Sequence, residues 1–491
     1  MGAVGSVLVW VSVIFRIASA IILTTCCTSW LAWTCDAIDF FAVSLTVSPL
    51  ATQFHKSTAQ ITTAITLTLL FRPVGAIIFG ILSDRFGRKW PLIFNLLLCC
   101  ILELGTGFVN TFSEFLGVRA LFGIAMGGIW GLSSASALEN LPVELRGIAS
   151  GVLQEGYAVG YLIAAVINLT LVAQHGWRVL FWTGAGISFF AAAIRVLVPE
   201  SAFFLRAKEQ EIARGTNTSQ KTKIFIKETK EMLKRHWLLC IYAVLLMTGF
   251  NFLSHGSQVG VSRVYKFTGR AHNDVHVQDL YPTYLETTKG FSAHDATVAT
   301  IIGNCGAVAG GVIAGWASQY IGRRLTIVIF TLLIGAFIPL WVLPSSFSAL
   351  SAGAFCIQVG VQGAWGVIPI QLAEMSPPAF RATFPGVAYQ IGNMISAASA
   401  QIEATGGANL KTTIIKDGVP TQEPNYATVQ AIFIGVVAAF VVVVTIVGPE
   451  NHSSHFEKHK TAFEEGGGRD DAVADNASQT SYHEVDEKSS A

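Results

Sequence analysis

The sequence predicts an all-α membrane protein with twelve spanning helices, arranged as two similar halves of six. Three observations predict this fold class. Of the 491 residues, 52% are hydrophobic and 13% are charged, whereas a soluble domain averages about 25% charged residues. Twelve stretches are apolar over roughly the 20 residues that a spanning helix needs. Several motifs also recur at one fixed offset, which indicates an internal duplication.

The candidate spans are these apolar stretches in chain order. In the first half they cover about 28–50, 61–83, 90–110, 113–138, 147–172 and 178–198. In the second half they cover about 237–258, 294–318, 325–343, 348–372, 382–403 and 428–448. Pro199-Glu200 and Pro449-Glu450 follow the last span of each half, which is a further sign of duplication. The predicted organisation is a first half at 28–198, a cytoplasmic central loop at 199–236 and a second half at 237–448.

Two terminal segments lie outside this pattern. Residues 1–27 are apolar and run into the first span without a polar break. They could be an additional anchor, an uncleaved signal segment or a misassigned start, and we favour the last. The tail at 449–491 is polar and rich in glycine, acidic and hydroxyl residues. We expect it to be disordered in the cytoplasm and open to regulatory factors.

Basic residues predict the orientation in the membrane. The central loop carries nine Lys/Arg against five Glu, and further basic residues follow the second, fourth, eighth and tenth spans. All of them lie on one side if both termini are cytoplasmic, as the positive-inside rule requires. We therefore expect a multi-pass membrane protein with both termini in the cytoplasm. One chain supplies both halves, so a monomer surrounded by lipid is expected.

The clearest repeat is a loop motif. Gly80-Ile-Leu-Ser-Asp84-Arg-Phe-Gly87-Arg88-Lys89 returns 235 residues later as Gly315-Trp-Ala-Ser-Gln319-Tyr-Ile-Gly322-Arg323-Arg324. It resembles the signature of the major facilitator superfamily. The glycines allow close helix approach, and Asp84 can accept hydrogen bonds from a helix N-terminus in its own half. We interpret the motif as a latch that breaks when the halves rock, the alternative being a topology signal only.

The second copy has Gln319 in place of Asp84, so the charged latch is expected to be one-sided. The same offset relates Glu139 and Arg146 to Glu374 and Arg381. The predicted latch residues are Gly80, Asp84, Arg85, Gly87, Arg88, Lys89, Arg119, Glu139, Arg146, Gly315, Gly322, Arg323, Arg324, Glu374 and Arg381.

Charged residues inside the first-half spans are candidate functional groups, because charges are costly in a membrane. Asp36 and Asp39 lie three apart on one face of the first span, with Arg72 in the second and Glu155 in the fifth. Arg72 is the best candidate to bind an anion, since guanidinium can grip a carboxylate with two hydrogen bonds. The alternative is a structural ion pair with one of the three carboxylates.

Polar residues inside the second-half spans form a matching group. Gln390 and Asn393 lie three apart on the eleventh span, and the offset places Gln390 opposite Glu155, so both are expected to face the centre. The seventh span ends in Asn251-Phe-Leu-Ser254-His255-Gly-Ser257-Gln258. His255 could carry a proton, because an unperturbed histidine titrates near neutral pH. Helix–helix hydrogen bonding is the alternative for all of these side chains.

The seventh-span segment resembles the signature of the fungal JEN carboxylate transporters, in the sialate:proton symporter group, which reads Asn-x-x-Ser/Thr-His-x-Ser/Thr-Gln-Asp-x-x-x-Thr. The match stops at Gln258 and resumes at Asp279 to Thr283. The resemblance implies proton-coupled symport of lactate, pyruvate, acetate or dicarboxylates at the plasma membrane, with substrate translocation tied to the seventh-span signature and to polar positions of the eleventh span. With the charged residues above, the expected substrate contacts are Arg72, Asn251, Ser254, Ser257, Gln258, Thr283, Gln390 and Asn393. Proton coupling is expected at His255 with Asp279, or at Asp36, Asp39 or Glu155.

The interruption at 259–278 has an unusual property. Its removal restores the signature, it begins with Val and ends with Gln, and twenty residues correspond to a whole number of codons. Valine codons begin GT and glutamine can be encoded CAG, which are the ends of an intron. We interpret the segment as a retained intron, the alternative being a genuine loop insertion.

Other function classes find no support in the sequence. A net charge of +1 gives no indication of nucleic acid binding. The eight cysteines lie in apolar stretches without metal-ligand spacing, so neither a metal site nor a cofactor is expected. Neither a phosphate-binding loop nor a nucleophile–base pair suggests an enzyme. The remaining alternatives are a sugar or sialic acid transporter and a non-transporting receptor or scaffold.

Overall fold

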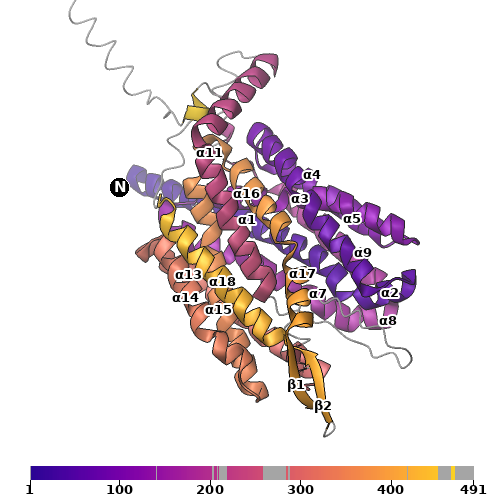
Figure 1. Ribbon diagram of the computed structural model, residues 1–491. Helices are drawn as coiled ribbons and strands as arrows, with labels where there is room; N and C mark the ends of the chain where they lie inside the picture. Colours follow the sequence, from indigo (N-terminus) through magenta and orange to yellow (C-terminus); the bar gives the residue numbers. More distant parts are fainter. Residues whose placement is uncertain are drawn as a thin grey trace, which may run out of the picture.

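The computed structural model describes residues 2–139, 141–201, 204–206, 208–209, 218–257, 284–285, 288–416, 419–451 and 466–469. These residues form an elongated bundle of helices with one short hairpin at an end (Figure 1). The first half of the bundle contains α1 (Gly2–Leu45), α2 (Val47–Phe54), α3 (Thr58–Phe86), α4 (Lys89–Thr106), α5 (Phe112–Met126), α6 (Ile129–Leu138), η1 (Val143–Leu145), α7 (Arg146–Ile167), η2 (Asn168–Val172), α8 (Ala173–His175) and α9 (Arg178–Leu197).

The second half repeats this arrangement. It contains α11 (Thr218–Ser257), α13 (Ala293–Ile321), α14 (Arg323–Val342), α15 (Phe347–Met375), η3 (Pro378–Phe380), α16 (Thr383–Ser396), α17 (Ser399–Asn409), β1 (Lys411–Lys416), β2 (Val419–Pro424), α18 (Tyr426–Val447) and η5 (Gly467–Arg469). Ten helical segments of the described residues are long and apolar enough to cross a membrane. Helix α1 and the pair α16–α17 occupy the other two predicted spans.

Local sequence explains where several helices begin and end. Ser57 with Gln60, Thr111 with Glu114 and Ser292 with Asp295 form capping boxes at α3, α5 and α13. Gly87 and Gly322 end α3 and α13 with φ angles of 93° and 89°. These left-handed values favour glycine, which explains its presence at the same place in both copies of the loop motif.

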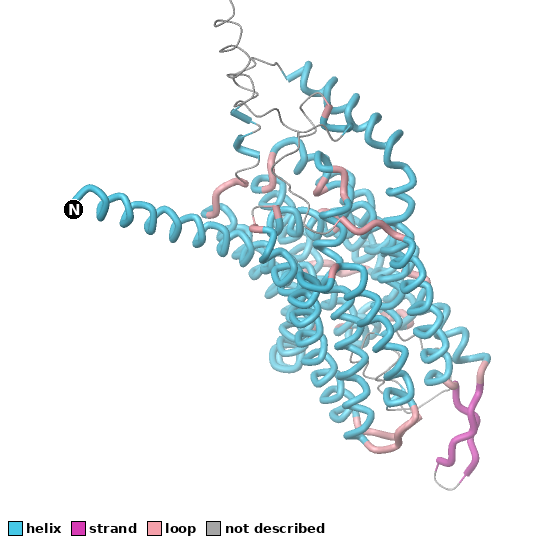
Figure 2. Tube along the Cα trace, turned by 90° about the vertical axis from the view of Figure 1, so that its left-hand side faces the viewer, coloured by secondary structure: helices cyan, strands magenta, loops and turns pink. Residues whose placement is uncertain are grey.

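The structure differs from the sequence prediction in four places. The predicted central loop is partly helical, because α11 begins at Thr218 and kinks at His236 before it enters the bundle. Helix α1 is continuous from Gly2 to Leu45 and projects sideways from the bundle in Figure 2. The first span ends at Thr46, whose hydroxyl donates to the Ala42 carbonyl at 2.6 Å. The antiparallel β1–β2 hairpin follows α17, where no strand was predicted.

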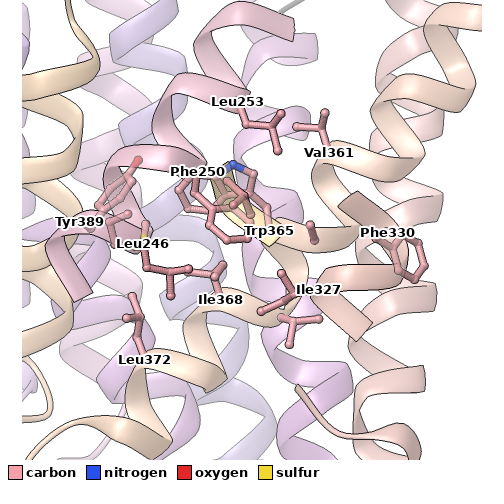
Figure 3. Packing of buried hydrophobic residues seen from close by; sticks show 14 of the residues in the cluster. Leu246, Phe250, Leu253, Ile327, Phe330, Val361, Trp365, Ile368, Leu372 and Tyr389 are labelled. Carbon is pink, nitrogen blue, oxygen red and sulfur yellow. The ribbon is translucent and has the colours of Figure 1, made fainter. Parts of the chain in front are cut away.

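Close packing within each half depends on a repeated glycine. A Cβ on Gly75 would overlap the backbone carbonyl of Ile124, and a Cβ on Gly310 would overlap that of Val359. Both pairs are separated by the offset of the loop motif, since 75 plus 235 is 310 and 124 plus 235 is 359. Helices α3 and α5 therefore approach each other as α13 and α15 do. Side chains from α11, α14, α15 and α16, among them Phe250 and Trp365, pack together in the hydrophobic core that Figure 3 shows.

The halves meet along two lines of contact. The first seam joins α3 and α6 to α16, where Gly80 lies against Thr383 and Gly131 against Gly386. The second seam joins α7 to α13 and α15. Because glycines dominate both seams, the two halves approach with backbone close to backbone.

Replacing Gly310 with alanine should destabilise the protein, because the new methyl group overlaps the Val359 carbonyl. Overpacking of this kind typically costs about 1–3 kcal/mol, which thermal unfolding of the purified protein would detect as a lower melting temperature. Gly186→Ala in α9 is the matched control, since nothing lies within 4 Å of its Cβ position. Equal melting temperatures for the two variants would contradict the packing argument.

Candidate functional site

One end of the bundle carries the same charged network twice. The guanidinium of Arg88 lies 2.6 Å from a carboxylate oxygen of Asp84 and 2.6 Å from one of Glu139. In the second half, Arg323 lies 3.0 Å from Glu374 and donates to the Gln319 amide oxygen at 3.1 Å. The arginine–glutamate pair is therefore present in both halves. The charged Asp84 is present only in the first half, where the second half has the neutral Gln319. We call this end of the bundle the latch end.

Asp84 and Gln319 reach across from one half to the other. Asp84 accepts hydrogen bonds from the backbone N–H groups of Ala382 and Thr383 at 3.3 and 3.1 Å, at the start of α16. The Gln319 amide oxygen accepts one from Gly147 N–H at 3.3 Å, at the start of α7. The expectation that Asp84 caps a helix of its own half is therefore wrong. Each half caps a helix of the other, so these contacts must break when the halves separate.

Two carboxylates that the sequence analysis did not assign hold the network in place. Glu200 accepts from the N–H groups of Arg88 and Lys89, both at 3.0 Å. Glu450 accepts from those of Arg323 and Arg324 at 2.8 and 3.0 Å. Each glutamate thus caps the helix that follows the loop motif. The repeated Pro-Glu was the sequence signal that could have identified them.

The other predicted latch residues lie around this network with different partners. Arg85 donates to Thr222 at 3.0 Å, and Arg146 donates to the Leu141 carbonyl at 3.1 Å. Arg324 donates to the Thr445 carbonyl at 2.9 Å. Arg381 is buried with 3% of its surface exposed.

Arg119 belongs to a different cluster, which corrects its assignment to the latch. Its guanidinium donates to Glu103 at 2.8 Å and to the Asp39 backbone carbonyl at 3.4 Å. The Asp39 carboxylate accepts from the Ser188 hydroxyl at 3.2 Å. Within the part of the chain that the structure describes, one oxygen of Asp39 and one of Glu103 have no hydrogen-bond partner. Two buried carboxyl groups against one guanidinium leave one negative charge, which a proton would balance.

A small cavity, with room for about one water molecule, lies between the halves. Five predicted site residues line it, namely Arg72, Asn251, Ser254, His255 and Asn393, together with Phe40, Gln154, Tyr157, Trp365 and Tyr389. Gln258, Asp279, Thr283 and the segment 259–278 lie outside the described residues. The cavity therefore brings together groups from both halves.

Arg72 lies on the first-half wall of this cavity, where its ion pair is long. Its guanidinium lies 3.7 Å from the Asp36 carboxylate and 5.0 Å from the centre of the Phe40 ring. It also donates to the sulfur of Met126 at 2.6 Å, while its Nε has no hydrogen-bond partner among the described residues. A guanidinium with one long ion pair and a free N–H can still accept an anion.

The second-half wall is a hydrogen-bonded chain of side chains. His255 Nε2 lies 3.2 Å from the amide oxygen of Asn393, whose nitrogen donates to Gln390 at 3.0 Å. Asn251 donates to the Met247 carbonyl at 2.8 Å. Gln390 thus lies behind Asn393 and orients it. Ser257 does not line the cavity, since its hydroxyl donates to the Ser254 carbonyl at 3.3 Å.

Aromatic rings complete the cavity, and the sequence analysis did not identify them. The Tyr389 ring lies 4.7, 5.7 and 6.2 Å from the rings of Trp130, Trp365 and Trp33. Aromatic residues in apolar helices look like ordinary core, so their spacing carries no signal for a site.

Glu155 does not face the cavity, which corrects another expectation. Its neighbour Gln154 lines the cavity and accepts from the Trp130 indole N–H at 3.2 Å. Adjacent residues on a helix point about 100° apart, because a turn contains 3.6 residues. Glu155 therefore points at Gly311 of α13, in the second seam.

Known proteins resemble this chain over most of its length. The sugar (and other) transporter family matches residues 11–463. A carboxylic acid transporter protein homolog of Saccharomyces cerevisiae is 35% identical over 86% of this chain and 67% of its own length. A cis,cis-muconate transport protein of Acinetobacter baylyi is 26% identical over 77% of this chain and 87% of its own.

The solved structure of the proton:xylose symporter XylE superposes with a TM-score of 0.62 at 18% identity, covering 89% of this chain and 98% of that one. This likeness concerns the fold. Together with the duplicated latch network and the family match, it means that the chain belongs to the sugar (and other) transporter family, with the fold of the major facilitator superfamily.

Proposed function

We propose that this protein carries short carboxylates, such as lactate or pyruvate, together with protons across the plasma membrane by alternating access. The observation that carries the proposal is the buried guanidinium of Arg72, with one long ion pair, on the wall of the inter-half cavity. The names of the yeast and Acinetobacter relatives, both carboxylate transporters, support the same substrate class. A neutral sugar would leave this charge without use.

The cavity provides a distinct contact for each part of such a substrate. The Arg72 fork would bind the carboxylate with two hydrogen bonds. His255 and Asn251 offer polar groups for the neighbouring hydroxyl or carbonyl oxygen, and Trp365 and Tyr389 cover the apolar remainder. Substrate thus contacts both halves, which would link its binding to their closure.

Proton coupling follows from the position of Asp36. Its carboxylate competes with the substrate carboxylate for Arg72, because both would lie on the same guanidinium. A proton on Asp36 removes the competitor, so that proton and substrate bind together. Asp39, one turn further on α1, connects this pair to the Glu103–Arg119 cluster. Coupling through His255 and Asp279 remains a proposal, since Asp279 lies outside the described residues.

The latch end would face the cytoplasm in this proposal, with both termini on that side. The described structure has the latch contacts formed, which corresponds to a carrier closed toward the cytoplasm. Separation of Asp84 from α16 and of Gln319 from α7 would open that side.

Replacing Arg72 with glutamine should reduce carboxylate uptake by roughly 30-fold or more, because losing one partner of a buried charged pair costs about 2–5 kcal/mol. Uptake of radiolabelled lactate at acid pH, in yeast that lacks its own uptake, measures the loss. Arg235→Gln, at an exposed position of α11, is the control and should transport normally. Undiminished uptake by Arg72→Gln at equal surface expression would refute the site.

Replacing Asp36 with asparagine should separate substrate binding from the proton. The variant keeps Arg72 free at every pH, so exchange of internal for external substrate should continue, while acid-stimulated accumulation should disappear. Both are measured with the same labelled substrate in vesicles of defined pH. Asp295→Asn, at the exposed cap of α13, should retain acid stimulation. Accumulation that still responds to acid in Asp36→Asn would assign the coupled proton elsewhere.

Removing residues 259–278 should raise uptake, because it restores Asp279 to the position after Gln258 in the seventh-span signature. The full chain and the shortened chain are compared at equal surface expression. Acid-stimulated uptake by the shortened chain alone would support both the symport and the retained intron. Equal uptake would make the segment a tolerated loop, and a dominant transcript that contains it would reject the intron.

A further inference from the structure

Along the second seam, the backbone of α7 packs directly against the backbones of α13 and α15. A Cβ on Gly151 would overlap the Gly311 carbonyl, and Gly147 lies against the Gly315 carbonyl. The Ser150 hydroxyl donates to the Gly366 carbonyl at 2.7 Å and accepts from Ile370 N–H at 3.1 Å. Such contacts leave no space for water between the halves along this line.

Glu155 lies at the inner end of the same line, one turn beyond Gly151. It is 5% exposed, and neither of its buried carboxyl oxygens has a hydrogen-bond partner in the described ranges of the chain. One of them occupies the space that a Cβ on Gly311 would fill. The carboxyl group therefore points from the first half directly onto the backbone of the second.

The neighbouring helices offer Glu155 no compensating charge among the described residues. Helix α13 presents Gly311, and α15 presents Gly366 and the Gln362 carbonyl near Gly311. Of the charged groups on the packed helices, Glu374 is paired with Arg323 at the latch end. On α1, Asp36 faces Arg72, while Asp39 accepts from Ser188.

Within α7, Arg146 donates to the Leu141 carbonyl. A buried carboxylate without any such partner is so costly that the group stays neutral instead.

We propose that Glu155 is a proton-binding site of the second seam, and that loss of its proton favours separation of the halves at the latch end. With the seam closed, the carboxyl group must carry a proton. When the seam opens, water reaches it, and a hydrated glutamate is ionised at neutral pH. Opening thus releases one proton, and closing takes one up.

The pH dependence has a definite sign. High pH on the side to which the seam opens stabilises the open form, and low pH stabilises the closed form. The ratio of the two should change by up to about tenfold per pH unit, as expected for one proton. Only the role of this site in the cell rests on the proposed function. Uptake of carboxylate with protons would lower the cytoplasmic pH, and the lower pH would disfavour further opening toward the cytoplasm.

Hydrogen–deuterium exchange of the full chain in lipid nanodiscs, without substrate, tests this proposal. The peptides of interest contain Arg146–Ser150 and Gly315–Ile321, which flank the seam at the latch end. The glutamine side chain of Glu155→Gln has the shape of a glutamate but cannot ionise. At a given pH, the intrinsic exchange rates of the two peptides are the same in this variant as in the unmodified protein. At about pH 8 the unmodified protein should exchange faster than Glu155→Gln, and the difference should shrink by up to about tenfold per pH unit as the pH is lowered to about 6.

Glu403→Gln is the matched control. Glu403 is 3% exposed on α17, and its carboxyl lies near Gly256 within the second half. This variant should keep the pH dependence of the unmodified protein. Glu155→Ala, which also lacks an ionisable group, should behave like Glu155→Gln and guards against a folding defect in one variant.

A pH-independent difference, or no difference, between the unmodified protein and Glu155→Gln would overturn the proposal, as would an equal effect in Glu403→Gln. Because no substrate is present, these results do not depend on whether the protein carries carboxylates.

Discussion

At the latch end, each half contains a helix whose N-terminus is capped by a side chain of the other half, and these contacts join the two halves. The first N–H groups of a helix have no partner within it, so they need an acceptor from outside. Asp84 supplies this acceptor to α16, and Gln319 supplies it to α7. Arg88 and Arg323 hold these two acceptors in position. When the halves separate, water must take the place of these acceptors at the N–H groups of α16 and α7. Separation therefore requires water to enter the latch end.

The first half carries an unbalanced set of buried charges. Asp36, Asp39 and Glu103 bring three carboxyl groups, whereas Arg72 and Arg119 bring two guanidinium groups. A single proton balances the set, since three minus two is one. A substrate carboxylate on Arg72 would add a further negative charge, which a second proton would offset. Low-dielectric surroundings make such imbalance costly, so the arrangement favours entry of an anion with a proton.

The duplication explains what the sequence could predict. Because the halves are alike, the offset that aligned Gly87 with Gly322 also located the Arg88–Glu139 pair and its copy. It could not show that Asp84 caps a helix of the other half, because that contact depends on how the two halves pack and not on how alike their sequences are. Arg119 was misassigned because no sequence pattern linked it to Glu103, its partner on the neighbouring helix.

Other features escaped because hydropathy measures apolarity and not backbone geometry. The eleventh span was predicted as one continuous segment at 382–403, yet α16 ends at Ser396 and α17 begins at Ser399. Tyr389 and its tryptophan neighbours could not be distinguished from core residues. The cavity residues Arg72 and His255 were found because a charge and a histidine are rare in membrane helices.

The one difference between the two latch networks makes the seams unequal. At the first seam a carboxylate caps α16, whereas at the second an amide caps α7. Hydrogen bonds to a charged acceptor are roughly twice as strong as those between neutral groups. The second seam therefore has the weaker cap, and it also holds the unpaired carboxyl of Glu155. Gain or loss of a proton at Glu155 therefore acts on the seam that is easier to open. A small change in free energy from this protonation is then enough to shift the balance between the closed and the open state.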